Sequence, residues 1–285
     1  MELATRIEGY IEQPFPIWNS NLTRELVNGR WKYLRNENLW DLNQYNTAGY
    51  ILKDPSLSFN RTPITCKSKP YTIYMEIPSF EYLTNFYKEN GLNPYTGREL
   101  EKICASEKLS CALDMINLVS PAYACVLNLV RAIQVIKSHN VKTDASYSHP
   151  DIPFSIFVSV CHDSSEYSNL RVAESILHEA MHLKLSLIES DVQLIKRGSV
   201  NKYFSPWRDE KRLAGGVLHG LYVFRAIFEF FRDLTSTPNS HYIKQYARNR
   251  QRLIIQDIKL ISNFANCSDL TEYGSILAGH LINSN

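Results

Sequence analysis

The sequence predicts an α+β protein that is predominantly helical, with a helical C-terminal half. Two short runs, residues 71–77 and 154–160, are rich in β-branched and aromatic residues and predict strands. Longer segments repeat apolar residues at helical spacing and predict helices over 99–139 and from about 168 to 190. The 285 residues are enough for one large domain or two small ones, with a sizeable buried core.

The predicted helices have recognisable starts and breaks. Pro121 should interrupt the helical stretch 99–139, because proline lacks the backbone donor that a helix needs. A polar turn after the second strand indicates a helix cap at Ser168 or Asn169. A further helix should begin after Pro206–Trp207 and run through the apolar stretch that follows. Terminal helices are predicted over 240–265 and 270–282.

The chain shows no repeat and no linker rich in Pro, Gly or Ser, so we expect one compact domain. Residues 1–150 form a mixed, loop-rich and aromatic N-terminal subregion, with a Tyr- and Asn-rich stretch near 40–50. This subregion is a candidate for peptide binding, although aromatic-rich segments more often belong to a core. Residues 151–285 form the helical region that carries the motif described below.

Composition and charge exclude several classes of protein. Apolar residues make up 44% and charged residues 21%, and 31 basic against 29 acidic residues leave a net charge of +2. This balance provides no basic field for nucleic acid and no polybasic membrane tag. No apolar run reaches the roughly 18 residues that a membrane span needs. The charged N-terminus is unlike a signal peptide, and the six cysteines form no CxxC pair. We expect a cytoplasmic protein with free thiols; nothing indicates its oligomeric state.

The most informative segment is an H-E-x-x-H motif at His178, Glu179 and His182. Residues four positions apart lie about 40° apart around a helix, so the two imidazoles share one face and can chelate one metal ion. Glu179 can reach toward a metal-bound water or a substrate. The strand at 154–160 precedes this helix. In metal enzymes with this motif such a strand commonly runs beside the active cleft and can pair with an extended peptide.

We therefore predict a zincin-like metal helix preceded by an edge strand. The alternative is a pair of buried structural histidines. A third ligand is needed, and the metzincin extension does not supply it, because Leu185 and Ile188 stand where that pattern has glycine and histidine. Glu189 lies about 10 Å beyond His182 along the same helix, too far to share the metal. The other candidates are Glu210, His219 and Glu229.

His219 is the favoured third ligand because glycines surround it in an otherwise bulky apolar helix. Gly215, Gly216 and Gly220 all weaken a helix, so their cluster requires a reason. One reason is room for a metal ion, its ligand and the facing helix. The alternative is close packing around a buried, hydrogen-bonded histidine. His162 could also line the cleft, because it follows the predicted strand.

The strand, the motif helix, the segment 205–212 with its P-W-R sequence, and the segment 216–224 with its H-G pair together resemble a known family. They are similar to the HExxH-containing peptide-modification proteins of ribosomal peptide natural-product pathways. Members of that family are iron(II)- and 2-oxoglutarate-dependent peptide β-hydroxylases. The resemblance covers about residues 154–230, roughly a quarter of the chain. Leu213 departs from the proline that the family often has after its second arginine.

The resemblance implies that His178, His182 and His219 hold iron(II), that 2-oxoglutarate and O₂ are co-substrates, and that a precursor peptide is hydroxylated. Three imidazoles suit both iron and zinc. A 2-oxoglutarate site also needs a cation for the distal carboxylate. We favour Arg212 and then Arg208, because the motif places them at the start of the His219 helix. The alternative for either is a solvated surface arginine, and Arg225 is a weaker candidate. Trp207 could pack over the cofactor or within the core.

Two other functions fit the motif. A zinc metallopeptidase would use Glu179 as the general base that removes a proton from a zinc-bound water. A histidine in the third ligand position, the absence of a secretion signal and the P-W-R to H-G segment favour the hydroxylase instead. In a hydroxylase Glu179 could bind a ligand water, orient a histidine or contact the peptide. The third candidate, a peptide-binding protein without catalysis, is disfavoured by the presence of all three ligand histidines.

Overall fold

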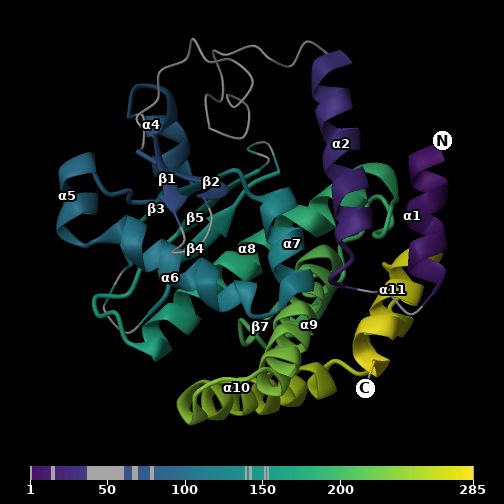
Figure 1. Cartoon of the computed structure of the whole chain (residues 1–285). Helices are drawn as coiled ribbons and strands as arrows, with labels where there is room; N and C mark the ends of the chain where they lie inside the picture. The colour runs from purple at the N-terminus through teal and green to yellow at the C-terminus, as the bar shows by residue number, and fades with distance from the viewer. Residues whose placement is uncertain are drawn as a thin grey trace.

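The computed structural model describes residues 2–13, 17–36, 61–65, 70–77, 80–138, 140, 143–150, 152 and 154–284. About 61% of these residues are helical, which confirms a predominantly helical α+β protein. The strands β1 to β5 gather in one half of the molecule, and both termini lie on the opposite side, with α1 next to α11 (Figure 1). The helices are α1 Glu2–Glu12, α2 Ser20–Asn36, α4 Phe80–Glu89, α5 Gly97–Lys102, α6 Ala105–Asn117, α7 Ser120–Leu129, α8 Glu166–Asp191, α9 Ala214–Ser236, α10 His241–Leu260 and α11 Glu272–Asn283.

A five-stranded mixed sheet has the order β1-β2-β3-β5-β4, in which β2, β3 and β5 run parallel and the outer strands run antiparallel to their neighbours. The predicted strands at 71–77 and 154–160 are confirmed as β2 and β5. However, β5, which leads directly into α8, is an internal strand, and the edge beside α8 is formed by β4. The strands of this sheet are β1 Arg61–Thr65, β2 Pro70–Glu76, β3 Ala132–Val135, β4 Ser146–Ser148 and β5 Ser155–Val158.

The motif helix α8 is the central rod of the fold. It packs against α6, α9, β4 and β5, and fifteen of its residues are buried. Its cap lies earlier than predicted: Ser165, rather than Ser168 or Asn169, accepts a hydrogen bond from the backbone N–H of Ser168 at 3.2 Å. Helix α8 therefore begins about one turn earlier than the sequence indicated. Because α8 is enclosed, its polar residues must find partners on the surrounding elements.

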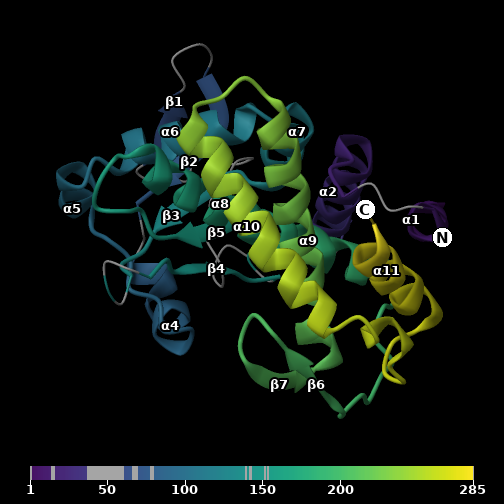
Figure 2. The ribbon, with the colours of Figure 1, turned by 90° about the horizontal axis from the view of Figure 1, so that it is seen from below.

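The helix that follows the P-W-R segment begins later than predicted. Residues 202–213 form a two-stranded hairpin of β6 (Lys202–Ser205) and β7 (Glu210–Leu213), with Pro206–Trp207 in its turn. Figure 2 shows this hairpin at one end of α9, with α10 lying across α9. Helix α9 is long and apolar enough to cross a membrane, but 61% of its most apolar window is buried inside the protein. That is the burial of a core helix and is compatible with a soluble protein.

The N-terminal region differs most from the prediction. The stretch 99–139 is not one helix with a single break: it contains α5, α6 and α7 and then the buried strand β3. Two helices, α1 and α2, occupy part of the region predicted to be rich in loops, whereas the Tyr- and Asn-rich stretch near 40–50 lies outside the described residues. One hydrophobic cluster includes Ile7, Leu109 and Leu281, so it joins both halves of the chain. The described cysteines are free thiols.

The cap of α8 gives a stability test. Replacing Ser165 by Ala leaves the N–H of Ser168 without its acceptor, and we expect a loss of about 1 kcal/mol in the free energy of unfolding. Urea unfolding followed by circular dichroism measures this loss. Ser164→Ala, one residue earlier on the exposed turn, serves as the control and should change stability by less than about 0.5 kcal/mol. Equal stability of the two variants would contradict the assigned cap.

Candidate functional site

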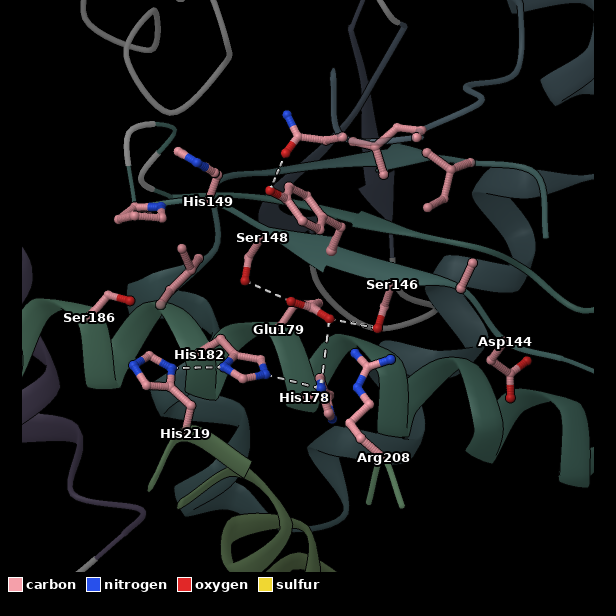
Figure 3. A pocket seen from close by; sticks show the side chains of 18 of the residues that line it. Asp144, Ser146, Ser148, His149, His178, Glu179, His182, Ser186, Arg208 and His219 are labelled. Carbon is pink, nitrogen blue, oxygen red and sulfur yellow. Dashed lines mark hydrogen bonds and ion pairs between the residues drawn. The ribbon is translucent and has the colours of Figure 1, made fainter. Parts of the chain in front are cut away.

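Three histidines from two helices meet beneath the sheet edge. His178 and His182 project from α8, and His219 approaches them from α9 (Figure 3). The Nε2 atoms of His178 and His182 are 3.1 Å apart, and Nδ1 of His182 is 3.1 Å from Nδ1 of His219. The rings of His182 and His219 are stacked, with centroids 5.3 Å apart. The structure thus brings together all three histidines that the sequence singled out.

The donor atoms of this trio fit a metal ion in part. With metal–nitrogen bonds of about 2.1 Å, two ligands at a right angle have nitrogens about 3.0 Å apart, close to the His178–His182 distance. His219, however, faces the other ring nitrogen of His182. Among the described residues, no three His, Cys, Asp or Glu side chains surround one common point.

The ring of His182 determines whether three donors can converge. Its Cε1 atom lies between Nδ1, which faces His219, and Nε2, which faces His178. Turning this imidazole over by 180° about the Cβ–Cγ bond exchanges Nε2 with Cε1 and so presents Nε2 between the two flanking rings. The chemistry of the donor set therefore suits a metal, whereas in the observed ring orientations the three nitrogens do not converge on one point.

The electrostatics of the site keep the α8 histidines neutral. Burial and the nearby charge of Arg208 lower the pKa of His178 to about 4. Burial also holds the pKa of His182 well below its usual range, and the neighbouring His178, His219 and Arg208 add to this effect. A metal ion binds the neutral form of imidazole, so both groups are in the required state at neutral pH without having to lose a proton.

Glu179 lies beside His178, and its carboxylate is hydrogen-bonded to the edge strand β4. Its carboxylate accepts hydrogen bonds from Ser146 Oγ and Ser148 Oγ, one on each oxygen and each 2.6 Å long. The residue is 3% exposed, and Oε1 lies 3.9 Å from Nε2 of His178. Burial raises the pKa of Glu179 to about 7, although the two serine hydroxyls and Arg208 act in the opposite direction. Glu179 is therefore buried, and its side chain is hydrogen-bonded to β4.

Of the three glutamates considered as ligands, Glu189 contacts the histidine trio, whereas Glu210 and Glu229 have other surroundings. Oε2 of Glu189 lies 2.8 Å from Nε2 of His219, so this carboxylate contacts the third histidine although it is two turns beyond His182. The sequence excluded Glu189 as a ligand and did not predict this contact. Glu229 instead pairs with the buried guanidinium of Arg225, and Glu210 lies on the exposed strand β7.

A cleft of about 1040 Å³ opens above the histidines and runs along β4 and α8. Arg208 and Arg212 both line it, but from the hairpin and not from the start of α9 as predicted. Arg212 lies 3.6 Å from a carboxylate oxygen of Glu210. The side chain of Arg208 forms no ion pair or hydrogen bond with another described residue. Arg225 lies outside the cleft: it is 1% exposed and stacks over Phe228.

The glycines around His219 lie where the hairpin β6–β7 packs against α9. A Cβ atom at position 220 would lie 2.5 Å from Cε3 of Trp207, and one at position 216 would lie 3.5 Å from Nε of Arg212. The indole of Trp207 stacks on Phe224, with centroids 5.0 Å apart. The predicted need for space is confirmed at Gly220, where Trp207 of the hairpin occupies it, whereas Gly215 and Gly216 would accept a Cβ at ordinary contact distances.

Other residues of the cleft could not be found from the motif. His149 lines it at the end of β4, next to the ring of Tyr147, whereas His162 is exposed and outside its lining. The expectation that His162 borders the cleft is therefore wrong. Ser146 and Ser148 were also missed. Their only local signal is a short polar run with a tyrosine between them, which is common in loops.

Comparison with other proteins leaves the site to be interpreted from its own residues. No protein-family model matches the chain, and no curated protein sequence matches it.

The contact between Gly220 and Trp207 yields a matched pair of variants. Gly220→Ala should displace the indole and lower stability by about 1–3 kcal/mol, because the added methyl group has no space. Gly215→Ala is the control on the same helix, where the nearest atom is 3.8 Å away. It should be neutral or stabilising by up to about 1 kcal/mol, since alanine favours helix. Urea unfolding and tryptophan fluorescence measure both. A stable Gly220→Ala protein with unchanged fluorescence would contradict this packing.

Proposed function

We propose that this chain is an iron(II)- and 2-oxoglutarate-dependent hydroxylase of the β-carbon of a side chain in a ribosomally made precursor peptide, acting in the cytoplasm. The observation that carries the proposal is the meeting of His178, His182 and His219 at the base of a large cleft, which is also lined by an arginine without an ionic partner among the described residues. The resemblance to HExxH-containing peptide-modification proteins supports the same chemistry over residues 154–230.

The three histidines would hold the metal ion. Iron(II), when bound with 2-oxoglutarate and O₂, would supply the oxidising chemistry, in which 2-oxoglutarate becomes succinate and CO₂ and a C–H bond of the peptide becomes C–OH. The protein's own contribution is to keep His178 and His182 neutral by burial and to hold His219 against Glu189. A carboxylate that accepts one ring N–H fixes the orientation of a ligand histidine and increases its basicity.

Arg208 is the better candidate for the distal carboxylate of 2-oxoglutarate, ahead of Arg212. Both guanidinium groups line the cleft, but Arg212 already faces Glu210, whereas Arg208 has no ionic partner within the described part of the chain. Arg208 also influences the pKa values of both α8 histidines and of Glu179, so it lies close to the trio. A guanidinium that is not already paired can bind a carboxylate bidentately without first losing another partner.

The cleft suits an extended peptide because β4 is an edge strand. The cleft is lined by residues 144–150, the whole of β4 with its flanks, and none of the described strands pairs with β4 on the side opposite β5. Unpaired backbone groups of an edge strand can hydrogen-bond a peptide that adds to the sheet. The mixture of polar and apolar residues in the lining is consistent with a polypeptide substrate of the kind that the resemblance implies.

A zinc metallopeptidase is the second candidate, and one observation favours it. Glu179 follows His178, and its pKa of about 7 would suit a general base at neutral pH. Against this role, both of its oxygens accept hydrogen bonds from serines of β4. A peptide-binding protein without catalysis would need none of the three histidines.

Succinate formation is the direct test. Protein loaded anaerobically with iron(II) and then exposed to O₂ and 2-oxoglutarate should form succinate, with an increase when the substrate peptide is present. His219→Ala should lower the rate by more than the roughly 10- to 100-fold typical of outer-shell partners, because a ligand is lost. His241→Ala, an exposed residue of α10, is the control. Zinc-dependent peptide cleavage without succinate formation, abolished by Glu179→Ala, would overturn the proposal in favour of the peptidase.

The assignment of the arginines predicts unequal effects on 2-oxoglutarate. Arg208→Ala should raise the KM for 2-oxoglutarate by about 10-fold or more, as expected for loss of a charge-assisted hydrogen bond. Arg212→Ala should have a smaller effect, because that guanidinium is already engaged with Glu210. Steady-state succinate formation at varied 2-oxoglutarate measures both values. A larger effect at Arg212 would make that residue, and not Arg208, the partner of the distal carboxylate.

A further inference from the structure

Glu179 connects two elements that are distant in the sequence. It lies on α8, more than thirty residues after the strand β4, yet Ser146 Oγ donates to its Oε1 and Ser148 Oγ donates to its Oε2, each at 2.6 Å. Figure 3 shows the carboxylate directed toward both serines, with His178 beside it at 3.9 Å from Oε1. Hydrogen bonds from neutral hydroxyls to a buried carboxylate are among the stronger ones in proteins.

The two serines occupy a special place on β4. The N–H of Ser159 donates to the backbone oxygen of Ala145 at 2.7 Å, so the backbone of Ala145 faces β5. Backbone groups of an antiparallel strand alternate in direction, so those of Tyr147 also face β5 and those of Ser146 and Ser148 face the open edge. The residues that hold Glu179 through their side chains therefore present their backbone groups at the edge that borders the cleft.

Besides its contacts with Glu179, β4 is held by its pairing with β5 and by Tyr147, whose hydroxyl donates to Oδ1 of Asn90 at 2.5 Å and whose ring packs against Phe157. The strand is three residues long, its burial is only partial, and among the described strands it pairs with β5 alone. A short edge strand of this kind opens readily, because few backbone hydrogen bonds must break. The hydrogen bonds to Glu179 connect β4 to α8, the described helix with the most buried residues. They reach α8 at the residue directly after the first histidine.

We propose that Glu179 is a positioning residue, which through Ser146 and Ser148 fixes the edge strand β4 against the histidine helix, and that it does not transfer protons. The inference rests on the proposed function in one respect: β4 is the strand on which the peptide backbone would be laid. Glu179 would then set the distance between the peptide backbone and the metal ligands.

Four variants of the full chain separate this role from that of a base. Two variants remove the hydrogen bonds between Glu179 and β4: the double variant Ser146→Ala/Ser148→Ala and the single variant Glu179→Ala. Glu179→Gln preserves hydrogen bonds to both serines, because the amide oxygen accepts from one hydroxyl and the amide nitrogen donates to the other. Ser146→Thr/Ser148→Thr keeps both hydroxyls and suits a strand. Thr143→Ala, whose hydroxyl bonds Asn140 in the preceding loop, is the matched control.

Two measurements are made on each variant. The rate of backbone hydrogen exchange in segments 143–150 and 155–160 measures how firmly β4 is held in place. This measurement needs no metal. We expect both alanine variants to accelerate exchange by about 10-fold or more, with no further increase when they are combined. The Gln, Thr and control variants should stay within about 3-fold of the wild type. Succinate formation from 2-oxoglutarate without peptide reports on the metal site. It should remain within about 3-fold in Thr143→Ala, and Glu179→Gln should lose no more of it than Ser146→Ala/Ser148→Ala does.

The outcomes are distinct. Unchanged exchange in Glu179→Ala, or additive effects of the two alanine changes, would overturn the anchoring role. Normal exchange in Glu179→Gln with loss of succinate formation would show that the carboxylate acts at the metal, which would also overturn it. If the wild-type protein forms no succinate at all, the proposed function fails, whereas hydrogen exchange still decides whether Glu179 anchors β4.

Discussion

The burial of α8 is the constraint on which the rest of the structure depends. This helix is enclosed by α6, α9 and the sheet, yet it carries His178, Glu179, His182 and Lys184. A buried polar group without a partner costs several kcal/mol, so each of these side chains needs one from a neighbouring element. Glu179 accepts hydrogen bonds from two serines of β4. His178 and His182 contact each other, and His182 also contacts His219. Lys184 donates to the carbonyl of Ile17. The polar residues of one helix thereby determine where the edge strand, α9 and the segment before α2 must lie.

Local patterns predicted the elements whose signal lies within a few residues. The β-rich runs identified β2 and β5, and helical spacing identified α8 and α9. The strand β3 was predicted as helix because all four of its residues are buried, so an internal parallel strand shows no alternation. The hairpin β6–β7 was missed because polar and apolar residues do not alternate along its strands, and because its turn contains Pro206–Trp207, which also suits a helix start. Asp209, at a φ of 50°, is the left-handed residue that closes this turn.

The site divides in the same way between local and long-range information. The pairing of His178 with His182 follows from helix geometry, and of the glycines near His219 only Gly220 marks a close approach. The residue that approaches Gly220 is Trp207, and its position depends on how the hairpin folds back onto α9. The contacts of Glu179 with β4 and of Glu189 with His219 join residues about thirty positions apart. No local pattern encodes such contacts, because they arise only when separate elements pack.

The geometry of an H-E-x-x-H helix explains why Glu179 and the histidines face different partners. Successive residues are rotated by about 100°, so Glu179 cannot point in the same direction as His178 and His182. One side of α8 faces α9 and its histidine, and the adjacent side faces the edge of the sheet. Whatever lies at that edge meets the carboxylate. In this protein the edge carries two serines in register with it, and both of its oxygens are engaged. The same helical spacing that gathers metal ligands thus also couples the ligand helix to the strand beside the cleft, and an assignment of this motif to hydrolysis or oxidation has to account for where its glutamate points.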